Sequence, residues 1–197
     1  MTIQLNWNVR NEALLERFLR QQRINQVLPY IKLYPNCHLL DIGCGWEARL
    51  LQDLAPYIQK GVGIDFKAPD IQSDRIQTFT AHIDKRLPFE DGSFEVVTML
   101  AVLEHLQHPL DILKECERIL KPSGALILTV PSHYAKPVLE FLAFRIGIVS
   151  KEEILDHKNY FNRADLENLF KRLDQLRLQR HTYFQWKFNN RVIAIKH

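Results

Sequence analysis

The residues best suited to chemistry lie at the ends of two short apolar stretches. Residues 38–42 run through Asp41 into the turn Gly43-Cys44-Gly45, and residues 61–65 end in Asp65. Glycines let a backbone approach a ligand closely, and a helix that follows such a turn points its N-terminal amides at that ligand. A carboxylate at the end of the second stretch can accept hydrogen bonds from both hydroxyls of a ribose. The pattern therefore predicts a nucleoside site.

The composition is typical of a soluble globular domain with a hydrophobic core. The chain has 197 residues, of which 46% are hydrophobic and 25% charged. A net charge of +3 is too small to indicate a polyanionic partner, so no nucleic acid is expected. Three scattered cysteines, Cys37, Cys44 and Cys116, form neither a disulfide framework nor a zinc motif. They favour a reducing, cytoplasmic setting without a resident metal. The polar residues 1–10 do not resemble a signal peptide, and residues 138–149 are too few to span a bilayer, so no membrane insertion is expected.

Strand-like and helix-like segments alternate along the first two thirds of the chain. The strands are expected at 38–42, 62–65, 76–79, 94–100 and 125–130, and the helices at 11–33, 46–54 and 109–120. A helix at 163–173 and strands at 176–183 and 192–195 follow, with Asn189-Asn190 as the turn between them. This order predicts an α/β, doubly wound (Rossmann-like) fold. Its seven-stranded sheet is mostly parallel, with an antiparallel C-terminal edge pair and helices on both faces.

Four ordered motifs narrow the class of protein. They are Gly43-Cys44-Gly45-Trp46-Glu47-Ala48, the segment 87–97, Leu103-Glu104-His105-Leu106, and the segment 118–131. The first fits G-x-G-x-x-G/A and is a weak signal when taken alone. Together, the four resemble the class I S-adenosylmethionine-dependent methyltransferases of the type 11, ubiquinone-biosynthesis-like subgroup. The resemblance is strong over residues 39–131 and weaker beyond them.

That resemblance implies S-adenosylmethionine as the cofactor and indicates where it lies. The methionyl end follows the glycine turn, the acid after the second strand holds the ribose, and the next residue packs on the adenine. The loop after the third strand touches the adenine edge, and the end of the fourth strand lies beside the sulfonium. The corresponding residues are Asp41, Gly43, Cys44, Gly45, Trp46, Asp65, Phe66, His82, Ile83, Asp84, Leu100 and Ala101.

Two residues depart from the pattern of the family. Glu47 stands where relatives commonly have a third glycine, so Ala48 is expected to take the close-packing role. His82 stands where many relatives carry an aspartate for the adenine amine.

The methyl acceptor is expected to be a small molecule whose identity the sequence does not give. The sulfonium is already an activated methyl donor, so the protein mainly has to position the nucleophile. A general base is needed only for a poor nucleophile such as a hydroxyl. The candidates for that role are His105, His133, Tyr134 and His157.

The chain is interpreted as a single methyltransferase domain, residues 1–197, of open oligomeric state. Its parts are an N-terminal helix (1–36), a cofactor-binding core (37–131), a segment that covers the substrate (132–162), and a helix with the terminal strand pair (163–197). Two alternatives remain: an adenosyl-cofactor-binding module without catalysis, and a nicotinamide-dependent oxidoreductase on the same fold. Trp46 and Glu47 favour the first, and Asp65 also fits the second. A nucleic-acid methyltransferase is disfavoured because no Asn/Asp-Pro-Pro-Tyr segment follows the fourth strand.

Overall fold

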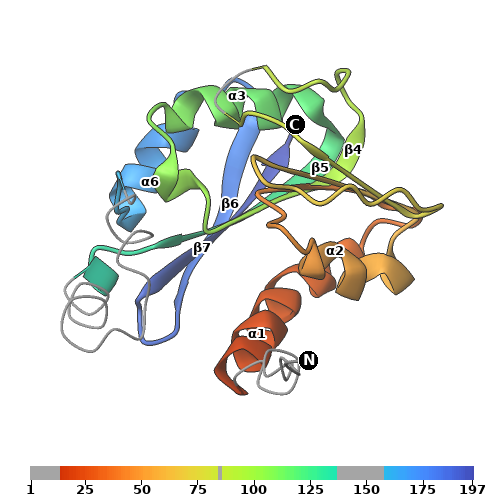
Figure 1. Ribbon diagram of the computed structural model, residues 1–197. Helices are drawn as coiled ribbons and strands as arrows, with labels where there is room; N and C mark the ends of the chain where they lie inside the picture. The colour runs from red at the N-terminus through yellow and green to blue at the C-terminus, as the bar shows by residue number, and fades with distance from the viewer. Residues whose placement is uncertain (1–13, 84–85, 137–157) are drawn as a thin grey trace.

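A mixed β-sheet organises the chain in the computed structural model, which describes residues 14–83, 86–136 and 158–197, with side chains from residue 21 onward (Figure 1). The sheet has seven strands in the order β3-β2-β1-β4-β5-β7-β6. The first five are parallel, and β7 is antiparallel to both β5 and β6. The predicted fold class is therefore confirmed. The strands are β1 His38–Ile42, β2 Lys60–Asp65, β3 Ile76–Thr80, β4 Phe94–Leu100, β5 Leu120–Pro131, β6 Leu176–Phe184 and β7 Asn189–Lys196.

Helices cover both faces of this sheet, as Figure 1 shows. The helices α1 and α2 pack on one face, and α3 and α6 pack on the other. Within the described residues, no helix is both long enough and apolar enough to cross a membrane. The bounds are α1 Leu14–Ile31, α2 Arg49–Leu54, α3 Pro109–Ile119 and α6 Arg163–Phe170, with short 3₁₀ turns η1 Ala55–Tyr57 and η2 Leu103–His105.

The apolar runs of the central strands follow from burial on both faces. In β1, Leu40 and Ile42 belong to the core under α3 and α6, whereas Leu39 belongs to the core under α1 and α2. Successive side chains of a strand point to opposite faces, so both sets must be apolar. This is why β1 and β4 could be recognised as strands from runs of mostly apolar residues, which Asp41 interrupts in β1 and Glu95 and Thr98 interrupt in β4.

The carboxyl ends of the parallel strands meet at one edge of the sheet. Because β6 pairs antiparallel with β7, and β7 pairs antiparallel with β5, strand β6 also ends at this edge. The loops after β1, β2, β4 and β5 and the β6–β7 turn therefore lie on the same side. In open α/β sheets, ligands bind at this edge.

The predicted turn at Asn189-Asn190 is wrong. The turn comprises residues 185–188, where Gln185, Trp186 and Lys187 take positive φ values of 49°, 55° and 71°. Asn190 is instead a buried residue of β7, and its amide donates to the carbonyl of Phe161 at 2.8 Å. Asparagine is a residue type typical of turns, but here its side chain bonds to the backbone of a segment that is distant in sequence.

The predicted start of the second helix at residue 46 is also wrong, because α2 begins at Arg49. Ala48, the residue before it, adopts a left-handed conformation with φ 48° and ψ 36°, which no helix can continue. Residues 46–48 therefore extend the glycine turn. Glu47 pairs with Arg49 across the junction.

One arginine fastens the loop before β4 to helix α3. The guanidinium of Arg118 donates to the Glu115 carboxylate at 2.7 and 3.1 Å, to the carbonyls of Leu87 and Phe89 at 3.1 and 2.7 Å, and to Asp91 at 2.8 Å. Although burial acts in the opposite direction, the Arg118 guanidinium and the amide of Leu87, which donates to Oε2 of Glu115 at 2.9 Å, hold the pKa of Glu115 below its usual range. The motifs at 87–97 and 118–131 are thus two sides of one structural clamp.

Replacing Arg118 with alanine should destabilise the domain by about 2–3 kcal/mol, because several charge-assisted hydrogen bonds are lost together. Arg118→Lys should recover little of this, since an ammonium cannot reproduce the planar fork of donors. Urea unfolding of the two variants beside the wild type measures the effect. Loss of less than about 0.5 kcal/mol in the alanine variant would show that the clamp does not stabilise the fold.

Candidate functional site

Three backbone hydrogen bonds hold the turn after β1 against the end of β2. The amides of Gly43 and Cys44 donate to the carbonyl of Ile64 at 2.8 and 3.1 Å, and the amide of Gly45 donates to Oδ2 of Asp65 at 3.0 Å. The two sequence motifs that predicted the site are therefore in direct contact. The position of the turn is fixed by its neighbouring strand.

The two glycines of this turn are required for different reasons. At Gly43, with φ +78°, a Cβ atom would lie 2.2 Å from Cγ2 of Val102, so a side chain here would displace the residue that follows β4. At Gly45, with φ +70°, a Cβ atom would meet no atom within 4 Å. Gly43 thus permits close packing, whereas Gly45 leaves open space at the surface of the turn.

Asp65 orients two amides and keeps capacity for a further ligand. Its Oδ1 accepts the amide of Lys67 at 3.0 Å, and its Oδ2 accepts that of Gly45. The residue is 8% exposed, and it contributes to the lining of a cavity. A carboxylate offers about four lone-pair sites, so each oxygen can accept a second hydrogen bond.

Asp41 is an almost fully buried acid with one hydroxyl partner. It is 3% exposed, and the Thr98 hydroxyl donates to its Oδ1 at 2.7 Å. Burial raises the pKa of Asp41 to about 7, while the Thr98 hydrogen bond and the charge of Arg23 act in the opposite direction and that of Asp65 adds to the rise. The carboxyl can therefore change its ionisation near neutral pH if a cation approaches.

A cavity of about 500 Å³ lies at this edge of the sheet. It brings together seven residues that the sequence had singled out: Gly43, Asp65, Phe66, His82, Ile83, Ala101 and His105. Five further lining residues were not predicted: Val102, Leu106, Gln107, His108 and Lys158. Four of them lie in the segment that follows β4, so their position after the end of a predicted strand is the sequence signal that could have found them.

Phe66 presents its ring to solvent at the rim of this cavity. It is 65% exposed, and the Lys67 ammonium lies 5.3 Å from the centre of the ring. An exposed aromatic face beside a polar cavity is a surface on which a flat heterocycle can stack.

Other predicted contact residues do not line the cavity. Cys44 and Leu100 are packed in the core under α1 and α2, and burial raises the pKa of the Cys44 thiol to about 12. Gly45 lies next to the lining through its contact with Asp65, whereas Asp41 is buried behind it with its hydrogen bond to Thr98. Trp46 is 75% exposed on the turn. Asp84 lies outside the described residues.

The candidate bases are dispersed along the ligand edge. His105 lines the cavity. His133, after β5, is elsewhere, with Nε2 3.2 Å from Oδ2 of Asp165 at the start of α6. The Tyr134 ring packs edge-on against that of Tyr183. His157 lies outside the described residues. No group of three His, Cys, Asp or Glu suited to a metal occurs in the described part of the chain.

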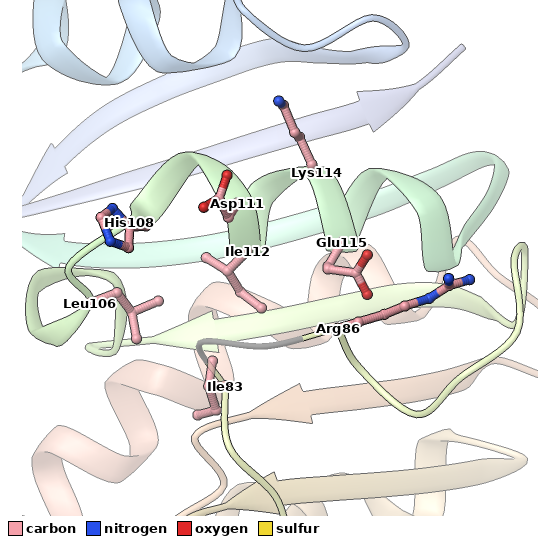
Figure 2. A pocket seen from close by; sticks show the side chains of 8 residues that line it. All are labelled: Ile83, Arg86, Leu106, His108, Asp111, Ile112, Lys114 and Glu115. Carbon is pink, nitrogen blue, oxygen red and sulfur yellow. The ribbon is translucent and has the colours of Figure 1, made fainter.

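A second cavity, of about 260 Å³, adjoins the first along α3. The two share Ile83, Leu106 and His108 in their linings. Figure 2 shows Ile112 and Glu115 of α3 on the side that faces Ile83 and Arg86, whereas Lys114 extends away. The depression therefore continues from the glycine turn along the flank of α3.

Relatives in sequence share this site region. Residues 40–128 match the family described as "Methyltransferase domain". A ubiquinone biosynthesis O-methyltransferase of Xanthomonas campestris pv. campestris is 30% identical over 148 residues, which are 69% of this chain and 57% of that protein. A demethylmenaquinone methyltransferase of Lactiplantibacillus plantarum is 30% identical over 129 residues, which are 58% of this chain and 54% of that protein. The chain thus spans little more than half the length of these relatives.

Solved structures share the fold at lower sequence identity. A SAM-dependent methyltransferase from Aquifex aeolicus superimposes with a TM-score of 0.63 at 17% identity, covering 93% of this chain and 97% of that one. The magnesium protoporphyrin IX methyltransferase of Synechocystis, solved with bound SAH, gives 0.64 at 14% identity, covering 92% and 84%. The domain match, the sheet order and the glycine turn show that residues 40–128 form a class I S-adenosylmethionine-dependent methyltransferase domain of type 11.

Proposed function

We propose that this protein transfers a methyl group from S-adenosylmethionine to a small-molecule acceptor. The observation that carries the proposal is the fastening of the glycine turn to Asp65 at the mouth of a cavity. This arrangement supplies backbone amides, an accepting carboxylate and an open approach to the turn, which are what a nucleoside with a polar tail requires.

Each part of the donor has a complementary group around the cavity. Asp65 accepts hydrogen bonds from the ribose hydroxyls, and Phe66 stacks on the adenine. The adenine edge lies against His82 and Ile83. The methionyl tail follows the backbone of the turn from Gly43 to Trp46 toward Asp41, and the sulfonium lies near Ala101 at the end of β4.

The electrostatics of Asp41 suit a cationic ligand. The donor carries a positive ammonium group on its methionyl tail and a positive sulfonium. A buried carboxyl with a pKa of about 7 becomes an ionised partner when such a charge arrives, because a nearby opposite charge favours the ionised form. In the apo protein, the Thr98 hydroxyl offsets the burial of this acid only in part.

A small-molecule acceptor is supported by the relatives. Their names indicate reactions on ubiquinone precursors, demethylmenaquinone and a sterol. Transfer itself requires in-line positioning of the nucleophile against the methyl group. His105 at the cavity, or His133 held by Asp165 beyond β5, supplies a base if the nucleophile is a hydroxyl.

Calorimetric titration tests the cofactor assignment. The wild type should bind S-adenosylmethionine and S-adenosylhomocysteine and should show no measurable heat with NADH. Asp65→Ala should weaken both adenosyl ligands at least about tenfold, because each charged hydrogen bond contributes about 1.5–3 kcal/mol. Glu90→Gln, an exposed acid away from the cavity, is the matched control. Binding of NADH without the adenosyl ligands would contradict the proposal.

Asp41→Asn should stabilise the apo protein and weaken its binding of S-adenosylmethionine. The folded state holds the Asp41 proton up to about pH 7, whereas the unfolded chain releases it near pH 4, so this group lowers stability progressively between these values. At pH 8 the neutral asparagine should therefore raise the free energy of unfolding by about 1 kcal/mol or more.

The same variant should bind S-adenosylmethionine at least about tenfold more weakly, since one unit of pKa change is worth about 1.4 kcal/mol. Wild-type affinity should rise with pH through about 7, and the variant should lack that rise. Urea unfolding and calorimetry at pH 6 and 8 give both quantities. A less stable variant with unchanged affinity would show that Asp41 is a structural acid.

A further inference from the structure

Glu104 is an acid that the proposed function leaves without a role. It lies in η2, the short turn that follows β4. Val102 before it and His105 after it both line the cavity. Glu104 itself is not a lining residue: it lies between these two in the chain and is buried beside the cavity, a few residues beyond Ala101, where the proposed function places the sulfonium.

One oxygen of the Glu104 carboxyl is buried without a hydrogen-bond partner. The residue is 1% exposed, and within the described part of the chain its Oε2 has no partner. Glu104 holds the neighbouring segment through its main chain: its carbonyl accepts hydrogen bonds from the amides of Lys158 and Asn159 at 2.9 and 3.0 Å. A leucine or a methionine would make the same backbone bonds. Packing alone therefore does not explain an acid here, since a buried polar group without a partner is unfavourable.

The ionisable groups around Glu104 come from several elements. Burial raises the pKa of Glu104 to about 8, while its own backbone amide and the charge of Arg23 on α1 act in the opposite direction. Arg23 acts in the same sense on Asp41 at the end of β1. One guanidinium thus influences both acids, which indicates that α1, β1 and η2 converge here. Among the described residues, His105 on η2 and Lys158, whose amide bonds to the Glu104 carbonyl, are further ionisable groups nearby.

We propose that Glu104 is the counter-charge of the donor's sulfonium: it ionises when S-adenosylmethionine binds, and it takes up the proton that methyl transfer releases. In the transfer, the bond between sulfur and the methyl carbon breaks, and the methyl carbon bonds to the acceptor's nucleophilic atom. The proton of that atom passes to the Glu104 carboxylate, which takes the place of the two histidines considered above as bases. This step rests on the proposed function and assigns the acceptor to the class of nucleophiles that carry a proton, namely hydroxyls and amines.

The loss of the sulfonium charge explains why the proton stays on Glu104. The thioether product is neutral at sulfur, so the field that kept the carboxylate ionised disappears. A buried carboxyl then returns to its protonated form. The acid is ionised, and therefore free to accept a proton, only while the methyl donor is present, and its affinity for that proton rises as the sulfonium charge is lost. Proton uptake is thereby tied to transfer.

The test compares S-adenosylmethionine with S-adenosylhomocysteine, which lacks the methyl group and the sulfonium charge. Calorimetry at pH 7 in two buffers of different ionisation enthalpy counts the protons released on binding. The methylated ligand should release up to about one proton more, because a group with a pKa near 8 is mostly protonated at pH 7. Asp41 should release equally with both ligands, since both carry the ammonium group.

Substitutions show which residue releases the extra proton. Glu104→Gln should abolish the extra proton release and lower the ratio of S-adenosylmethionine to S-adenosylhomocysteine affinity about tenfold, which is the equivalent of one unit of pKa. Asp41→Asn should lower the release common to both ligands and keep the difference. Glu90→Gln should behave as the wild type.

The wild-type comparison needs no substitution, so it decides the matter even if Glu104→Gln does not fold. Equal proton release with the two ligands overturns the role of Glu104 and leaves the proposed function standing. Absence of binding by either ligand overturns the proposed function, and the role of Glu104 with it.

Discussion

The site depends on the bonds that fasten the turn after β1 to the end of β2. Gly43 and Cys44 share the carbonyl of Ile64, and Gly45 uses the carboxylate of Asp65. With the turn fixed in this way, Val102 can approach Gly43 closely, and the loop after β4 closes one side of the cavity. A side chain at Gly43 would separate these loops, and the cavity would lose its shape even if every strand stayed in place.

The same edge of the sheet carries acids that weaken the empty protein. Asp41 and Glu104 are both buried, and burial raises the pKa of each by several units. Such groups persist where a ligand compensates them, so stability in the apo form and affinity for a cation are opposed. By contrast, the Arg118 clamp satisfies its acids within the fold and adds stability without a ligand.

The central strands were predictable because they are buried on both faces and their residues are therefore mostly apolar. The mostly apolar runs of β1 and β4 gave their bounds correctly, although Asp41, Glu95 and Thr98 interrupt them. Two local features were wrong, the start of α2 and the β6–β7 turn. Ala48 before α2, and Gln185, Trp186 and Lys187 in the β6–β7 turn, adopt left-handed conformations. These residue types rarely adopt that conformation, so the sequence does not predict it. Tertiary contacts decided these positions.

The candidate site was predictable where residue type and strand end coincide, as at Asp65 and Phe66. The contribution of Lys158 was not, because it reaches η2 through a backbone bond across a long sequence separation. The burial of Glu104 could not be predicted either. Its neighbour His105 was the candidate base because histidine is a common general base. Contacts between the loops after different strands are set by the fold as a whole.

The most direct test of the account is a crystal structure of the protein with S-adenosylhomocysteine. The ribose hydroxyls should lie within hydrogen-bond distance of Asp65, the adenine should stack on Phe66, and the amino acid tail should follow the turn from Gly43 to Gly45. A ligand bound elsewhere, or one whose ribose does not contact Asp65, would contradict the assignment of this edge of the sheet as the cofactor site.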